Sequence, residues 1–227
     1  MKYIALLAAT VAAQSEAPST ANWIATGTAN FTAWIDKDDR AFVRYQAWVP
    51  KKSWLAIAFT DKTYKKGDNE NTPAMQGDFF WIRTSNRNGD RIEDNEVKDY
   101  NGDKDGQPSR EDPGDKRNVE NFERWDRDRD GKQYTEFRWR RRLDTNQGED
   151  TKFVCDKNME EAKPMEYNWF TKSNSREETA YETAGQWTMK FYKDKDNNCQ
   201  LEVMMSSAVR ALASLTAMGA AYVAASL

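Results

Sequence analysis

Histidine is absent from this chain of 227 residues. Histidine is the commonest metal ligand and the commonest general base near neutral pH. Its absence excludes His-dependent catalytic triads, zinc hydrolases built on histidine, and haem sites with two histidine ligands. Serine and threonine are abundant, but no base accompanies them in a recognisable arrangement. The sequence therefore predicts neither an enzyme nor a metal site.

Neither positively nor negatively charged residues are in large excess. The 34 lysines and arginines nearly balance the 37 aspartates and glutamates, and the net charge is -3. Because so small a net charge attracts polyanions weakly over long distances, we expect no nucleic-acid partner. The 9 tryptophans, 9 tyrosines and 10 phenylalanines are enough apolar material for the core of one domain.

Cysteine is scarce. Only Cys155 and Cys199 occur, and they form no CxxC pattern. In an exported chain two such cysteines most simply form one disulfide, whereas in a reducing compartment they would be two buried thiols.

Long hydrophobic runs are missing, and the apolar segments lie at the two ends. Lys2 is followed by an apolar run over residues 3–13 that is too short to span a bilayer. This pattern is typical of a secretory signal peptide (residues 1–13) cleaved after Ala13, with a buried N-terminal helix as the alternative. Residues 206–227 carry no charge after Arg210 and resemble either a GPI attachment signal or a packed C-terminal helix. We expect a secreted or extracellular protein, free or attached to the cell surface through a C-terminal lipid anchor.

Residues 22–205, between these ends, have the pattern of an all-β domain. Residues 54–59 and 79–82 are apolar on both side-chain parities, which predicts strands covered on both faces. The polar loop between them ends near Met75, which either plugs the core or presents its thioether at a binding site. Residues 132–143 alternate between apolar side chains and outward arginines, and these arginines predict a charge ladder with Glu120, Glu123 and Glu136.

The turn signals between the segments favour an antiparallel β-sandwich of about 9 to 11 strands. The predicted strands are residues 28–35, 40–49, 54–59, 79–82, 91–97, 118–125, 132–143, 151–155, 166–170, 186–192 and 200–204.

Five short motifs, in order along the chain, resemble a DOMON domain over roughly residues 25–193. They are Trp54-Leu55, Met75 to Asp78, Asp99-Tyr100, Pro108 to Asp112, and the run from Arg141 to Asp150. The resemblance implies an immunoglobulin-like β-sandwich, usually extracellular, that binds haem b or a sugar.

The resemblance also implies where haem would bind. The methionine of the Met-x-x-Asp motif is an axial ligand in haem-binding members, and it corresponds to Met75. The opposite ligand is usually a histidine, but Glu182 stands near that position. Some relatives use lysine, so Lys172 or Lys163 is the candidate here, provided that burial removes its proton. A haem b electron-transfer domain of this kind would need a redox partner on a separate chain.

Three functions follow as hypotheses. The first is a non-catalytic module that binds a carbohydrate or another small ligand at the sandwich end around Met75, and the second is the haem b domain. The third is a structural or adhesion protein of the cell surface. The aromatic residues are either a sugar platform or part of the core; they are Trp81, Tyr100, Trp169, Tyr181 and Trp187. The one N-glycosylation sequon begins at Asn30.

Overall fold

The computed structural model describes residues 16–59, 77–84, 96–102, 108–111, 118–146, 150–173 and 182–205. The predicted signal peptide, the apolar tail, Met75 and Tyr181 lie outside these ranges. Within them no helix is long and apolar enough to cross a membrane.

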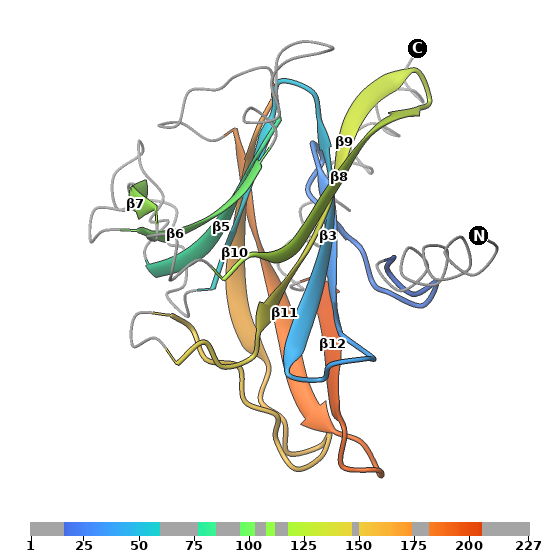
Figure 1. The fold of residues 1–227 in the computed structure, drawn as a ribbon, viewed down its shortest axis with the longest axis vertical. Helices are drawn as coiled ribbons and strands as arrows, with labels where there is room; N and C mark the ends of the chain where they lie inside the picture. Colours follow the sequence, from blue (N-terminus) through green and yellow to red (C-terminus); the bar gives the residue numbers. More distant parts are fainter. Residues whose placement is uncertain are drawn as a thin grey trace, which may run out of the picture.

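The described residues form two antiparallel sheets that face each other (Figure 1). The five-stranded sheet has the order β1-β2-β3-β9-β8, and the seven-stranded sheet has the order β12-β11-β10-β4-β5-β6-β7. The strands are β1 Ile24–Ala25, β2 Asn30–Ile35, β3 Phe42–Pro50, β4 Trp54–Ala58, β5 Gly77–Arg83, β6 Glu96–Gly102, β7 Pro108–Glu111, β8 Glu120–Arg129, β9 Lys132–Arg142, β10 Met165–Lys172, β11 Thr183–Lys193 and β12 Cys199–Met205. These two antiparallel sheets confirm the predicted all-β sandwich.

The predicted strand at residues 151–155 is wrong. Phe153 does point into the core, where it is 3% exposed, which explains the period of two in the sequence. Its backbone N–H donates to the carbonyl of Leu143, outside both sheets, and the next ladder contact is a single parallel bridge between Asp156 and Tyr192. This segment crosses between the sheets and does not extend either of them. The short strands β1 and β7 were not predicted, because neither carries an alternating apolar pattern.

Strands β4 and β5 are buried on both faces, as the sequence predicts. Leu55 and Ile57 point into the main core between the sheets, while Trp54, Ala56 and Ala58 point outward. The outward side chains form a second apolar cluster in which Trp54 and Trp81 are each 1% exposed. We call this the outer cluster; it contains Trp54, Ala56, Ala58, Phe79, Trp81 and Phe170, with Tyr100 and Ala184 packed against it.

The β8–β9 hairpin turns more tightly than the sequence suggests. Asp130 and Gly131 have φ of 54° and 71°, the two positive values of a type I′ turn, so the strands continue almost to the tip. The predicted charge ladder on its outer face is confirmed, since Arg140 and Arg142 pair with Glu120 at 3.4 and 3.5 Å.

The prediction of outward arginines needs one correction. Arg141 shares the parity of Phe137 and Trp139, points inward and is fully buried.

A glycine in β11 permits one close approach. Gly185 lies opposite Trp169 of β10, and a Cβ on Gly185 would fall 2.3 Å from Cζ2 of that indole. The Trp169 ring therefore packs directly on the backbone of the neighbouring strand.

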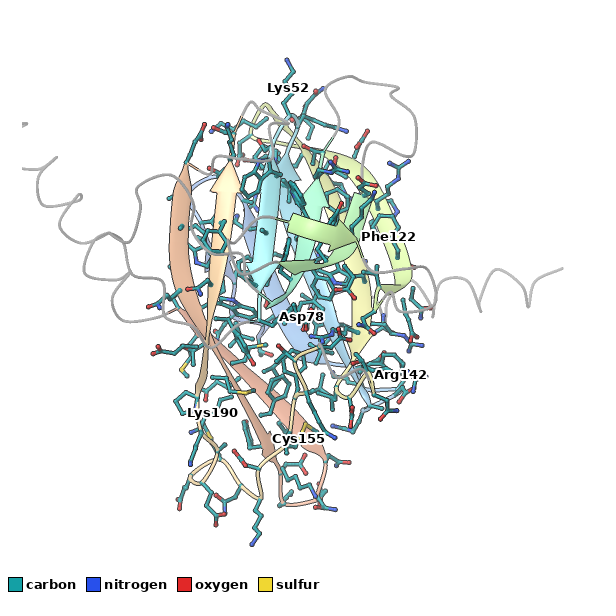
Figure 2. All side chains as sticks on the ribbon, turned by 90° about the vertical axis from the view of Figure 1, so that its left-hand side faces the viewer. Lys52, Asp78, Phe122, Arg142, Cys155 and Lys190 are labelled. Carbon is teal, nitrogen blue, oxygen red and sulfur yellow. A yellow bond between two sulfur atoms is a disulfide. The ribbon has the colours of Figure 1, made fainter. Side chains whose placement is uncertain are left out.

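The predicted disulfide is present. Cys155 and Cys199 are 44 residues apart, with their Cα atoms 5.8 Å apart, and they join the crossing segment to the start of β12 (Figure 2). The backbone of Asp156 reinforces the link through hydrogen bonds to Phe191 and Lys193.

We expect loss of the disulfide to lower the free energy of unfolding by about 4 kcal/mol, the chain-entropy value for a loop of this length. Urea unfolding of the double variant Cys155→Ser, Cys199→Ser measures this loss. Reductant should shift the unfolding midpoint of the wild type and leave that of the double variant unchanged. Equal midpoints for the oxidised and reduced wild type would contradict the expectation.

Candidate functional site

Two of the predicted platform residues lie in the core. Trp169 and Trp187 are 2% and 0% exposed and point between the sheets, where Trp187 meets Phe31 edge to face at 5.1 Å. Neither ring presents an open face.

Trp81 and Tyr100 lie together on the other side of the seven-stranded sheet. Trp81 belongs to the outer cluster, and the half-buried Tyr100 ring stacks on Phe79 at 5.6 Å and meets Trp81 at 5.4 Å. Lys172 is half-buried at the end of β10 and lies directly opposite Trp54, so its side chain leaves the sheet on the same face. The structure thus brings three predicted site residues, Trp81, Tyr100 and Lys172, to one face.

Glu182 has a local structural role. Its carboxylate accepts hydrogen bonds from the hydroxyl and the backbone N–H of Ser173, at 2.6 and 3.1 Å. The Ser173 hydroxyl, followed by its N–H, holds the pKa of Glu182 below its ordinary value. The exposed carboxylate therefore links Ser173, just after β10, to the residue just before β11.

The main core contains a buried ion pair that the sequence analysis did not predict. Arg141 on β9 donates to the carboxylate of Asp78 on β5 at 2.6 Å, and their side chains are 0% and 2% exposed. Thr151 joins both groups, because its N–H donates to Asp78 at 2.9 Å and its carbonyl accepts from Arg141 at 3.0 Å. The guanidinium carbon lies 5.1 and 5.0 Å from the rings of Phe59 and Phe153.

Further acidic groups surround this pair. The backbone N–H of Asn118 donates to Asp99 at 2.9 Å and its side-chain amide donates to Asp150 at 2.5 Å. Burial alone would lower the pKa of Arg141, but the nearby carboxylates, above all Asp78, raise it above its ordinary value. Asp78, Asp99, Arg141 and Asp150 belong to three of the five short motifs seen in the sequence, and these four residues meet here. In Figure 2 Asp78 lies near the middle of the molecule, between Lys52 and Cys155.

A groove of about 720 Å³ lies on the outer face of the five-stranded sheet. This volume is within the range of small-ligand sites. The groove is lined by Glu16, Ala17, Trp23, Asn30, Gln46, Trp48, Arg127, Arg129, Glu136 and Arg138. Residues of β2, β3 and β9 form its floor, because Asn30, Trp48 and Glu136 stand side by side across these strands.

One buried carboxylate organises the floor of the groove. Glu136 is 1% exposed and accepts hydrogen bonds from the Gln46 amide at 2.6 Å, the Arg138 Nε at 2.7 Å and the Arg127 Nε at 2.8 Å. The Arg138 guanidinium also lies 4.5 Å from the Trp125 ring. These contacts fix the polar side chains in advance of any ligand.

The chain's own N-terminal segment reaches into the groove. Glu16 pairs with Arg138 at 2.9 Å, and the backbone N–H of Ala17 donates to the Gln46 side-chain oxygen at 2.9 Å. Asn30 is half-buried on the floor, so a glycan on this residue would begin inside the groove. Its glycosylation stays a prediction.

Comparison with known proteins does not identify a family, because no protein-family model, curated protein or solved structure matches the chain. In the described part of the chain, no three Cys, Asp or Glu side chains cluster in a way that could hold a metal ion.

The groove was missed for a physical reason. Its tryptophan and amide lie on β3 at alternate positions, Gln46 and Trp48, and its charges lie on β9. The period of two was visible in each strand, but the sequence does not show which strands are neighbours, and β3 pairs with β9 across some 90 residues of chain. The outward charges of β9 alone indicated only a ladder.

The buried ion pair predicts that substitutions of two aspartates, Asp78 and Asp126, lower the free energy of unfolding by very different amounts. Asp78→Asn should lower the free energy of unfolding by about 3 to 5 kcal/mol, because Arg141 is left as an unpaired buried charge. Asp126→Asn is the control, since its pair with Lys51 is exposed and such pairs contribute at most about 1 kcal/mol. Urea unfolding measures both.

Arg141→Met is the second single variant of a double-mutant cycle with Asp78→Asn. The double variant Asp78→Asn, Arg141→Met should be more stable than the sum of the two single losses allows, because neither member of the pair is then left as a buried charge without the other. Additive losses, or an Asp78→Asn loss no larger than that of Asp126→Asn, would contradict a buried ion pair.

Proposed function

We propose that the chain is a secreted or cell-surface DOMON-like module that binds a carbohydrate or another small ligand and is not an enzyme. The ligand site is the groove on the five-stranded sheet. The observation that carries the proposal is the combination of the Trp48 ring with a hydrogen-bonded floor of Gln46, Glu136 and Arg138.

Sugars need this combination of surfaces. A sugar ring presents apolar C–H faces and a rim of hydroxyls, so it is bound by an aromatic face beside fixed polar groups. Trp48 and the 38% exposed Trp23 supply apolar surface, and Asn30, Gln46 and Arg138 supply donors and acceptors. Because Glu136 already holds Gln46 and Arg138 in place, little ordering cost remains for these two side chains when a ligand binds.

Location and family are part of the proposal. The Cys155–Cys199 disulfide is weak support for an extracellular location, since disulfides persist in oxidising compartments. Support for the DOMON-like assignment comes from the meeting of the motif residues Asp78, Asp99 and Arg141 around one buried ion pair. If the chain has the fold of that family, motifs that are far apart in the sequence are expected to lie together in one cluster.

The groove should bind neutral or acidic oligosaccharides through Trp48. In a glycan array followed by calorimetry, Trp48→Ala should weaken the strongest interaction at least about tenfold, which corresponds to the loss of about 1.4 kcal/mol. Phe122→Ala is the matched control, because this aromatic residue, labelled in Figure 2, is 40% exposed but is not one of the residues that line the groove. No glycan binding by the wild type, or equal weakening by both variants, would contradict the groove as the ligand site and leave the adhesion hypothesis.

A haem b electron-transfer domain is the second candidate. One observation favours it: Lys172 stands on the same face as Trp54 and Trp81, where apolar surface suited to a macrocycle is gathered. Against it, the outer cluster is already almost fully buried, so a haem would have to replace what covers these rings. Lys172 and Met75 would be the axial ligands, and a separate redox partner would be required.

Haem titration decides between the two candidates. A haem domain should give a sharp Soret band that Met75→Ala and Lys172→Ala each shift or abolish. Lys163→Ala is the control, because this exposed residue lies before β10, in the segment of the disulfide. If the wild type gives no band, or if Lys172→Ala leaves it unchanged, the proposed ligand pair is wrong.

A further inference from the structure

We propose that Asn30 carries an N-linked glycan and that the first sugar of this glycan lies in the groove, packed against the Trp23 ring. This site goes beyond the proposed function, because its sugar is a covalent part of the chain and not a ligand that arrives from outside. Asn30 opens the sequon Asn30-Phe31-Thr32, and both Asn30 and Trp23 line the groove.

A tight hairpin brings Asn30 close to Trp23. The turn between β1 and β2 is closed at Thr26 and Ala29, where the Thr26 backbone N–H donates to the Ala29 carbonyl at 2.9 Å and the Ala29 N–H donates to the Thr26 hydroxyl at 2.8 Å. After the turn Asn30 pairs with Ala25. Trp23 stands two residues before Ala25, so its side chain leaves the chain on the same side. Diagonal neighbours of this kind are close enough for one large group to reach both.

The Asn30 amide is free to carry a sugar. Its side chain is half-buried on the groove floor, yet it makes no hydrogen bond within the part of the chain that the structure describes. On one side it has Ala25, whose side chain is short and exposed. On the other side it has Trp48, and the Arg129 guanidinium already lies over that ring at 5.9 Å. The open direction for a first sugar is therefore over Ala25, toward Trp23.

Trp23 offers the apolar surface that the sugar covers. The side chain is 38% exposed, and among the described residues no second ring stacks on it and no guanidinium lies over it. A sugar ring has apolar C–H faces, and an indole ring is a large, rigid apolar surface that can receive one of them. Covering an exposed tryptophan removes apolar area from water and so stabilises the folded chain.

The glycan must be attached before these strands pair. Thr32 supplies the hydroxyl that the sequon requires, but in the folded chain this residue is 0% exposed and donates to the Asn22 carbonyl at 2.7 Å. The transferase therefore acts on the unfolded chain, and folding carries the sugar into the groove.

The donor is an oligosaccharide linked to a lipid through pyrophosphate. A bond forms between the Asn30 amide nitrogen and C1 of the first N-acetylglucosamine, while the bond from that carbon to the pyrophosphate oxygen breaks. The amide loses one proton to a base of the transferase, and the lipid pyrophosphate leaves with the bonding electron pair. No oxidation or reduction occurs.

The test begins with the full chain produced in two hosts. A eukaryotic secretory host can attach the glycan, whereas the periplasm of a bacterium without the transferase cannot, and the disulfide forms in both. Mass spectrometry of the peptide that contains Asn30 should find the glycan on most chains from the first host. Asn30→Gln produced in the secretory host is the control, and it should match the unmodified bacterial chain in urea unfolding.

Urea unfolding then measures the contact with Trp23. After an endoglycosidase has trimmed the glycan to one N-acetylglucosamine, the folding equilibrium constant should be at least about threefold above that of the unmodified chain. Trp23→Ala should remove most of this gain. Phe122→Ala should keep all of it, because the Phe122 ring is 40% exposed but does not line the groove. Trp23→Phe should keep part of the gain, and it provides a second test should Trp23→Ala fail to fold.

Each outcome bears on the glycan alone. A secreted chain without sugar on Asn30 overturns the proposal. A sugar that leaves unfolding unchanged, or that stabilises Trp23→Ala as much as the wild type, overturns its position against Trp23. None of these measurements uses an added ligand, so a negative glycan array contradicts the proposed function and leaves the result at Asn30 standing.

Discussion

The buried pair of Arg141 and Asp78 is the constraint on which the arrangement of the two sheets depends. A charge without water is tolerated only when its partner and its remaining hydrogen bonds are in place. Here the pair joins β9 of one sheet to β5 of the other at 2.6 Å, and Thr151 is bound to both members. The sheets therefore have a specific separation and offset at this point, which apolar contacts alone would define less sharply.

The loops near the pair follow from the same requirement. Phe59 and Phe153 cover the guanidinium, and Thr151 also donates its hydroxyl to the Phe59 carbonyl at 2.7 Å. The end of β4 and the crossing segment are thus held together by this hydrogen bond. The Cys155–Cys199 disulfide fixes the continuation of that segment to β12, so the crossing segment is held at both of its ends.

The structural features that could be predicted from the sequence are those that depend on local sequence pattern. Both-face burial of β4 and β5 was visible because every residue from Trp54 to Ala58 is apolar, and the β8–β9 hairpin was visible from its Asp-Gly turn. What it did not reveal depends on pairing between distant strands. Arg141 looked like one more arginine of a charged run, although its parity matched that of Trp139, because a buried arginine is improbable until a buried carboxylate such as Asp78 is placed beside it.

Strand β9 shows how closely the core and the groove are linked. Arg141 points inward to the ion pair, while Arg138 and Glu136 point outward to the groove floor. Because side chains of a strand alternate between faces, a slip of one residue against β3 would place Glu136 and Arg138 in the core and expose Arg141. Such a slip would bury charges without partners and is therefore excluded energetically. The ion pair that fixes the register of β9 thus also fixes the positions of the groove's charges, although no atom of the pair lines the groove.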